Sequence, residues 1–521
     1  MKRLVSVTVC VLLLLTVVFT VVACGKDETD YLVIYNWADY IFDEKLTDFK
    51  EYYEDLTGKP IEITYGTFDT NETMLTRLTQ SDSNVDVVCP SEYAIQKLWE
   101  SDMLVPLNYF SENEYVKDFS DEVKSKYLSS GEHNSDNVEP QIKQKVEGAF
   151  GDMINYFVPY MYGTLGILYN KYAFKDMGIY DKEIMNKANW GILFNDDGDG
   201  NVLHEDLTGY ILMKDSIRDS YAATIFYLKE RGLLDEFTDE QGNALYADMD
   251  AGELINAVDE NLLEIVRDTL IKQKSQLFGY EVDFGKDDLL QNNAIVDLAW
   301  SGDALFAVEE SWDANIVKED GTKGDYELGY YVPHGAGNIW FDGWVVPKTY
   351  NSNHMEAIKI FINWLNRPEV AAQNLLEIGY TPAIAPDVLQ GSDEAMQILM
   401  ESYDYDFDNE DDYDEFVSEF FDYKDVIDGS NWRYPFESAP IERDQTNPFD
   451  RSIDTLGVMR DFGANNKKVV TMWNHARSAG VNALPLLGWT ALAVAVAVGA
   501  LYAVIGIKRW KSQTVKIENK E

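Results

Sequence analysis

The chain has 521 residues, with 43 Lys or Arg against 91 Asp or Glu, and a formal net charge of −48. Hydrophobic residues make up 46% and aromatic residues 13%, which excludes a largely disordered chain and leaves apolar surface for roughly two to four packed domains. A surface this acidic repels phosphate, so a nucleic-acid partner is excluded and a metal ion or an organic amine is favoured.

The N-terminus has the pattern of an export signal. Lys2 and Arg3 precede an apolar run from Leu4 to Val22, and a small residue then precedes Cys24. This resembles a bacterial lipoprotein signal, which implies a signal peptide over 1–23, lipidation of Cys24 and a tether over 24–30. The alternative is a signal anchor that stays uncleaved. Only Cys89 is left after Cys24, so no disulfide within the exported chain is expected.

After the tether, short β-branched runs alternate with amphipathic segments. The pattern predicts, in order, a strand over Tyr31–Trp37, a helix from Phe42 to Leu56, a strand over Ile61–Tyr65, a helix capped by Asn71, a strand over Val85–Cys89 and a helix over Ala94–Trp99. Such a βαβαβα order predicts a parallel sheet, whose ligands bind beyond the carboxyl ends of the strands. Trp37 to Tyr40 and Ser91 to Tyr93 fall there.

Residues 195–206 have the spacing of a calcium-binding loop. Oxygen-bearing side chains recur at alternate positions, Gly200 stands at position six, and an acid closes the loop at position twelve. The predicted ligands are Asn195, Asp197, Asp199, Asn201 and Asp206. Asn195 and Asp206 replace the usual first Asp and last Glu, so the alternative is a solvated acidic turn. Bound calcium would have a structural role there.

Two later segments stand apart by composition. Residues 401–428 hold 13 acids and eight aromatic residues, which indicates a folded acidic face that either concentrates a cationic ligand or is simply a solvated surface. Residues 486–507 hold Thr490 as their only polar side chain. That length predicts a membrane helix, placed at 484–508, and the basic residues after it place the tail 509–521 in the cytoplasm.

Several short strings, in order, resemble the spermidine/putrescine-binding proteins of bacterial ABC transporters. They are Tyr35–Tyr40, Thr70–Met74, Val85–Tyr93, Pro159–Thr164, Trp300–Gly302, Trp340–Gly343 and Ile378–Pro382. The likeness covers roughly residues 31–480 and implies an α/β, two-lobed periplasmic-binding-protein fold of type II. It places lobe 1 at 31–160 and 341–388, and lobe 2 at 161–340 and 389–480.

The resemblance also implies the ligand site. Carried over residue by residue, the substrate-binding residues are Trp37, Tyr40, Ser91, Tyr93, Asp219, Trp300, Trp340, Asp342 and Tyr380. Asp342 would bind one primary ammonium, and Trp300 and Trp340 would cover the methylene chain. The chemistry agrees, because aromatic faces attract ammonium groups and cover methylenes. Ser216 stands where some members carry a second carboxylate, which favours a diamine over spermidine.

The predicted function is therefore capture of a polyamine, putrescine or spermidine, at the outer face of the cytoplasmic membrane and its delivery to separate permease and ATPase subunits. No cofactor is required by this function. The five histidines are widely separated, and no catalytic or nucleotide-binding motif occurs, so an enzyme is not expected. The alternative keeps the fold but makes the chain a membrane-tethered sensor of polyamines or small organic cations without a role in transport.

Overall fold

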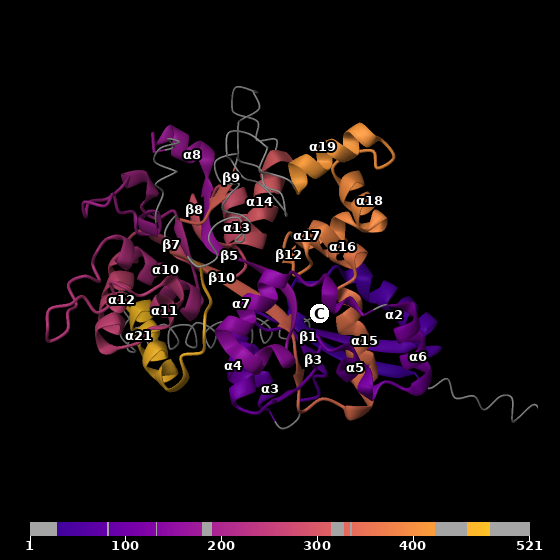
Figure 1. Ribbon diagram of the computed structural model, residues 1–521. Helices are drawn as coiled ribbons and strands as arrows, with labels where there is room; N and C mark the ends of the chain where they lie inside the picture. The colour runs from indigo at the N-terminus through magenta and orange to yellow at the C-terminus, as the bar shows by residue number, and fades with distance from the viewer. Residues whose placement is uncertain are drawn as a thin grey trace, which may run out of the picture.

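The computed structural model describes residues 29–80, 83–131, 133–179, 190–313, 328–333, 336–421 and 456–479 (Figure 1). The predicted signal peptide, Cys24, the membrane helix at 484–508 and the cytoplasmic tail lie outside these residues. No helix within the described ranges is long and apolar enough to cross a membrane.

The first lobe is built on a three-stranded parallel sheet, as the alternating sequence pattern predicts. β1 (Asp30–Trp37) lies in the centre, with β2 (Ile61–Phe68) on one side and β3 (Val87–Val88) on the other. The helices that connect them are α2 (Asp43–Thr57), α3 (Asn71–Leu78) and α4 (Glu92–Glu100). Thr70 caps α3 in place of the predicted Asn71, because the Asn71 amide turns toward the start of α4, where it bonds Ser91 and Tyr93.

Helices cover both faces of this sheet. Phe49 and Tyr53 of α2 pack on one face together with α6 (Asp121–Ser130) and α15 (Met355–Leu365). Met74 of α3 packs on the other face together with α4 and α7 (Pro140–Phe150). The first lobe is completed by α5 (Glu112–Tyr115) and by the short antiparallel pair β4 (Leu104–Val105) and β11 (Val346–Pro347).

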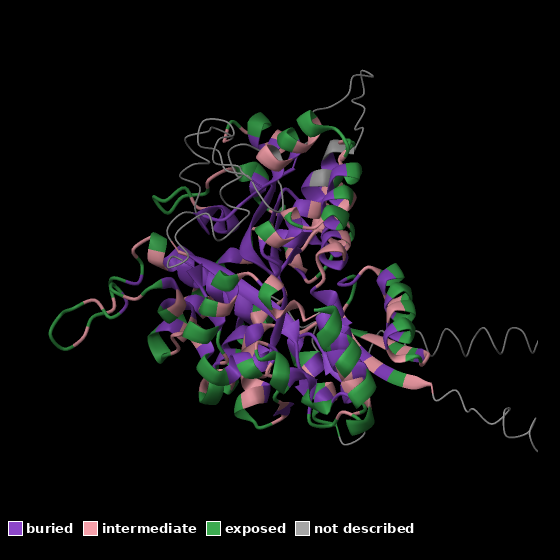
Figure 2. Ribbon diagram, turned by 45° about the vertical axis from the view of Figure 1, so that its right-hand side comes forward, coloured by how far each residue is buried: buried purple, intermediate pink, exposed green. Residues whose placement is uncertain are grey.

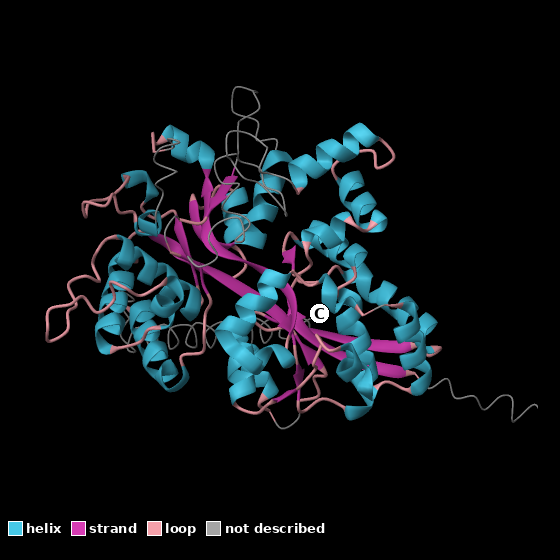
Figure 3. Cartoon of the chain, viewed as in Figure 1, coloured by secondary structure: helices cyan, strands magenta, loops and turns pink. Residues whose placement is uncertain are grey.

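The second lobe is built on a mixed eight-stranded sheet (Figure 3). Its main path runs in the order β13 (Leu456–Gly457), β10 (Gly337–Trp344), β5 (Val158–Asn170), β8 (Val296–Trp300), β6 (Ile211–Lys214) and β7 (Leu277–Glu281). Both β9 (Leu328–Tyr331) and β12 (Thr381–Pro382) pair with β5. All 13 residues of β5 are buried, and Figure 2 shows the strands at the buried centre with exposed helix faces outside.

Two of these strands connect the lobes. β5 and β10 run antiparallel, and β10 carries a bulge between Asp342 and Gly343. At the bulge and just beyond it the chain meets the first lobe, where Ser91 bridges Asp342 and Val88 bridges Val345. The interlobe crossovers are therefore a hydrogen-bonded ribbon that extends the large sheet into the first lobe.

Helices cover both faces of the second sheet as well. One face packs against α10 (Ile217–Glu230), α11 (Ala251–Asn256), α12 (Glu260–Gln273) and α21 (Asn466–Ser478). The other packs against α13 (Gly285–Leu290) and α14 (Ser301–Asp313), while α8 (Lys171–Asp176) follows β5. Leu254 of α11 and Trp473 of α21 belong to the same apolar core, so the last described helix is part of this lobe.

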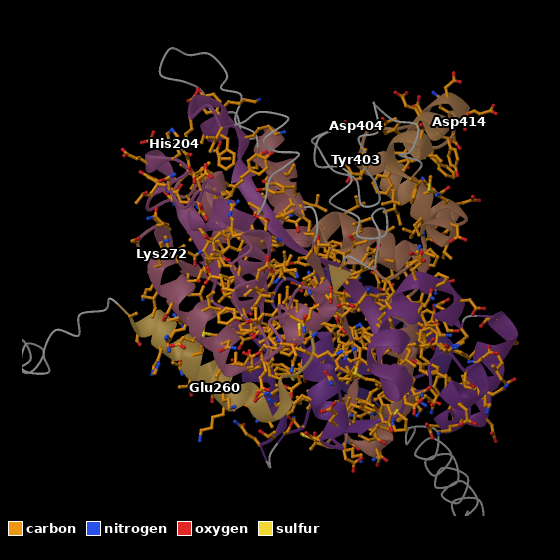
Figure 4. All side chains as sticks on the ribbon, turned by 60° about the vertical axis from the view of Figure 1, so that its left-hand side comes forward. His204, Glu260, Lys272, Tyr403, Asp404 and Asp414 are labelled. Atoms are coloured by element: carbon orange, nitrogen blue, oxygen red, sulfur yellow. The ribbon has the colours of Figure 1, made fainter. Side chains whose placement is uncertain are left out.

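The acidic segment forms helices, as its aromatic residues predict. α18 (Asp393–Ser402) and α19 (Glu410–Phe420) pack with α16 (Pro368–Ile378) and α17 (Pro386–Gln390) around a separate apolar cluster that includes Phe416 and Phe420. The predicted lobe boundary at 388 falls inside this cluster, and residues 422–428 lie outside the described part of the chain. Acidic side chains such as Asp404 and Asp414 lie on its outer surface (Figure 4).

Candidate functional site

A cavity of about 420 Å³ lies between the two lobes. The first lobe lines it with residues that follow β1 and with the first turns of α3 and α4, and the connecting strand β10 adds Trp340 and Asp342 on the same wall. The second lobe lines it with the chain after β6, β7 and β8 and with Trp473 and Arg477 of α21. Most of this lining therefore comes from the carboxyl ends of parallel strands, where α/β sheets bind ligands.

All nine residues predicted to bind substrate line this one cavity. They come from segments far apart in the sequence, from Trp37 after β1 to Tyr380 before β12. The role of each residue in binding a ligand stays a prediction, because lining a cavity does not by itself establish a ligand contact. The cavity also has an excess of acids, which are Asp39, Asp69, Glu72, Glu92, Asp215, Asp219, Glu281, Asp283, Asp303 and Asp342, against the bases Lys214, Lys286 and Arg477.

Asp342 is the central carboxylate of the first-lobe wall. The Tyr40 hydroxyl donates to its Oδ2 at 2.9 Å, and the Ser91 side chain also hydrogen-bonds it. Its Oδ1 is buried and has no hydrogen-bond partner among the described residues. Burial raises the pKa of Asp342 to about 7, and no basic residue in the described part of the chain acts against that rise. One acceptor atom is therefore left for a donor from outside the chain.

Glu92 lies beside Asp342 at the start of α4. Its Oε2 accepts the Phe341 backbone N–H at 3.0 Å, while Oε1 has no hydrogen-bond partner among the described residues. Burial is the main cause that raises the pKa of Glu92 to about 8, and the charge of Asp342 adds to it. Glu92 is not among the residues predicted from the sequence, although it stands between two of them, Ser91 and Tyr93.

Aromatic rings surround Asp342. Tyr380 packs edge to face on Tyr40, with ring centroids 5.0 Å apart, and tilts against Trp340 at 5.7 Å. Gly302 makes room for this arrangement, because a Cβ there would lie 2.3 Å from the Tyr380 ring. The indole N–H groups of Trp37 and Trp340 are buried and have no acceptor among the described residues. The surroundings of Asp342 are thus largely aromatic, and they include two indole donors that the described residues leave without an acceptor.

Asp219 lies across the cavity in the first turn of α10. Ser216 caps this helix, and its Oγ accepts the Asp219 backbone N–H at 3.4 Å. Burial raises the pKa of Asp219, whereas hydrogen bonds from Ser216 and Trp300 lower it. The charge of Asp219 in turn raises the pKa of both Asp342 and Glu72 on the opposite lobe, in addition to burial. Carboxylates of the two lobes therefore face each other and repel.

Three basic side chains on the second-lobe wall were not predicted from the sequence. Each one pairs with a carboxylate that also lines the cavity, as Lys214 Nζ with Glu281 at 2.5 Å, Lys286 Nζ with Asp303 at 2.9 Å and Arg477 Nη2 with Asp215 at 2.8 Å. The partners lie on different elements, so no local spacing in the sequence indicates them. The second-lobe wall is thereby largely neutralised by the chain itself.

The predicted calcium loop lies on the outer surface of the second lobe, away from the cavity; His204 within it is labelled in Figure 4. Asn195 is buried, and its amide bonds the His204 backbone and Gln276. Asp197 accepts the backbone N–H groups of Asp199 and Asn201. Among the described residues, no cluster of acids, histidines or cysteines has the arrangement of a metal site.

The same closure occurs in a loop that lacks calcium spacing. Asp239 accepts the backbone N–H groups of Gln241 and Asn243 and the Asn243 side chain, as Asp197 does with Asp199 and Asn201. An Asp followed four residues later by Asn can therefore close this turn through its own hydrogen bonds, which is the solvated acidic turn given above as the alternative.

Comparison with known proteins agrees with the fold and with the resemblance. The chain is 23% identical over 365 residues, or 70% of its length and 80% of theirs, to the spermidine/putrescine-binding periplasmic protein of Escherichia coli (strain K12). It is 25% identical over 66% of its length to the putrescine-binding periplasmic protein SpuD of Pseudomonas aeruginosa, covering 75% of that protein.

Solved structures show the same two-lobed α/β fold. The TpPotD lipoprotein of Treponema pallidum superposes with a TM-score of 0.55 at 16% identity, over 86% of this chain and 99% of that one. The substrate-binding protein PotD of Streptococcus pneumoniae superposes with a TM-score of 0.50 at 24% identity, also over 86% and 99%. Residues 47–400 match the model of one family. The chain therefore belongs to the bacterial extracellular solute-binding proteins.

Proposed function

We propose that this protein is the substrate-binding component of a polyamine ABC transporter, which captures putrescine or spermidine between its lobes and delivers it to a permease. The observation that carries the proposal is Asp342, a buried carboxylate surrounded by Tyr40, Trp340 and Tyr380, with one oxygen that no described residue hydrogen-bonds. The names of the curated relatives support the same class of ligand.

The energetics suit a dication. A charge-assisted hydrogen bond contributes about 1.5 to 3 kcal/mol, and each cation–π contact about 0.5 to 2 kcal/mol where water is excluded. Two such hydrogen bonds and several ring contacts together reach the roughly 8 kcal/mol of a micromolar site after association costs. An ammonium between Asp342 and Asp219 would also relieve the repulsion between carboxylates of the two lobes. Ligand would in that way favour the closed arrangement.

The direct test is calorimetry of the full chain in detergent with putrescine, spermidine, a sugar and a peptide. Binding of at least one polyamine at micromolar concentration or tighter is expected. Heat with the sugar or the peptide, and none with any amine, would refute the proposal.

The membrane attachment is proposed with it. Lipid on Cys24 and a helix at 484–508 would hold the binding lobes at the outer face of the cytoplasmic membrane, with 509–521 inside. Mass spectrometry of the protein purified from membranes would show a diacylglycerol adduct on Cys24 and no residues 1–23, whereas an intact N-terminus would support the signal anchor instead.

A sensor is the second candidate, and α21 is the observation that favours it. Trp473 and Arg477 of this helix line the cavity, and the predicted membrane helix follows it closely in the sequence. Ligand would then be reported across the membrane through α21. Co-purification with a permease and an ATPase supports transport, whereas a signalling receptor in their place supports the sensor.

We also propose that the loop at 195–206 binds a calcium ion with a structural role. A thermal-shift experiment with and without calcium tests it, because an ion that binds only the folded protein raises the melting temperature. No shift, or an equal shift in Asp197→Asn, would leave the self-closed turn as the explanation of this sequence.

A further inference from the structure

Lys214 is a buried cation inside the ligand cavity. It ends β6, is 2% exposed, and lines the cavity next to Trp300. Its ammonium lies 4.3 Å from the centre of the Trp300 ring, 2.5 Å from Glu281 Oε1 and 3.0 Å from the Val282 carbonyl, to which it donates. This is the environment that a ligand ammonium needs, namely an aromatic face, a carboxylate and a carbonyl acceptor.

The sheet holds this ammonium in place. β6 pairs with β7 so that Lys214 stands opposite Glu281, and Glu281 Oε2 also accepts the Gly285 backbone N–H at 2.8 Å. Asp297 of the neighbouring strand β8 is buried beside them, with neither oxygen hydrogen-bonded among the described residues. Burial lowers the pKa of Lys214, but Glu281, Asp297 and Asp303 together raise it above its ordinary value. The ammonium is thus charged and fixed.

The other bases of this wall leave little anionic surface for a ligand. Lys286 pairs with Asp303, and Arg477 pairs with Asp215. Asp219 and Asp283 are the second-lobe carboxylates of the cavity without an ion pair among the described residues. Burial raises the pKa of both, and the charge of Lys214 acts against that rise. Lys214 therefore offsets part of the negative charge that this wall offers to a ligand ammonium.

We propose that Lys214 is a specificity-determining residue, a built-in ammonium that occupies the cation-binding position over Trp300 and thereby makes the cavity select a short diamine over a triamine. This selectivity rests on the amine binding proposed above. A ligand with a third ammonium would bring it toward Lys214, and like charges at close range in a cavity of low polarity repel strongly. A diamine that spans from Asp342 to Asp219 brings one ammonium to this wall, where the Asp219 carboxylate offsets the charge of Lys214, whereas a triamine brings a second.

The first test needs no variant. Calorimetry on the full chain in detergent with putrescine, cadaverine and spermidine should show both diamines binding at least tenfold more tightly than the triamine. Spermidine binding as tightly as putrescine, or more tightly, overturns the role of Lys214 but leaves polyamine binding intact. Binding of none of the amines refutes the proposed function, and with it the selectivity.

The second test removes the built-in charge together with its partner. The double variant Lys214→Met with Glu281→Gln removes the lysine together with its ion-pair partner, and should move the spermidine-to-putrescine affinity ratio at least tenfold toward spermidine. Lys272→Met, at an exposed position of α12 (Figure 4), is the matched control and should leave the ratio unchanged. A double variant that binds putrescine with the wild-type ratio contradicts the proposal; if it does not fold, the wild-type series alone decides.

Discussion

The two walls of the cavity are both rich in carboxylates, but they differ in how many of these carboxylates are paired with a base. On the second-lobe wall, Glu281, Asp303 and Asp215 are each paired with a base from another element. On the first-lobe wall, Asp342 has no basic partner among the described residues, and they leave one of its oxygens without a hydrogen bond. The carboxylates of the second-lobe wall are therefore held mainly by ion pairs within the protein, whereas the first-lobe wall keeps an acceptor for a ligand. A ligand cation would complete the first wall, while the second would supply its shape and the carboxylates Asp219 and Asp283, which have no ion pair among the described residues.

The largest effect expected from this difference is on Asp342. Asp342→Asn removes the charge that an ammonium would bind, so polyamine affinity should fall by about 1.5 to 3 kcal/mol, roughly 10- to 150-fold. Calorimetry measures it, with Glu260→Gln on the exposed start of α12 as the control for loss of a surface acid (Figure 4). Equal affinities in Asp342→Asn and the wild type would mean that the first wall does not bind the cation.

The pH dependence of binding should follow the protonation of Asp342 on the first-lobe wall. Because the pKa of Asp342 is raised to about 7 and polyamine ammonium groups stay charged, only the deprotonated carboxylate binds well. Affinity should therefore fall about tenfold for each pH unit below 7. Glu92, with its pKa at about 8, titrates nearby, so Glu92→Gln separates the two groups. A profile that is flat between pH 5.5 and 8, measured by calorimetry, would contradict this assignment.

The aromatic part of the first wall should contribute less. Trp340→Ala removes a ring that packs on Tyr380 beside Asp342, and one cation–π contact corresponds to about 1 to 2 kcal/mol, or roughly five- to thirtyfold in affinity. Trp99→Ala is the matched control, because Trp99 packs against Tyr156 outside the cavity. If both variants bind alike, Trp340 serves only to pack the core.

The smallest effect concerns the empty protein. The pKa of Asp342 is raised in the folded state, so the stability that its protonated form supplies is full below about pH 4 and is lost as the pH rises to 7. Asn resembles the protonated acid. Asp342→Asn should therefore raise the melting temperature of the ligand-free protein by a few degrees at pH 8 and leave it unchanged at pH 4. A lower melting temperature at pH 8 would show that the carboxylate stabilises the fold.

The sequence predicted the part of the site that depends on local position. Trp37, Tyr40, Ser91 and Tyr93 follow strands of a parallel sheet, and the order of strand and helix was enough to bring them to one edge. Asp342 came from the family resemblance. The ion pairs of the second wall could not be predicted, because Lys214 and Glu281, or Asp215 and Arg477, meet only through strand pairing and helix packing. The packing of α18 and α19 on α16 was beyond the sequence for the same reason.

The antiparallel pairing of β5 and β10 has a mechanical consequence. Strands that are hydrogen-bonded along their length bend together, so the lobes cannot swing about one flexible peptide. Each change in the angle between the lobes instead twists the ribbon over several residues, among them Trp340 and Asp342. The side chains that would bind the ligand therefore lie on the segment that twists. The geometry of the binding site and the angle between the lobes depend on the same few backbone torsions.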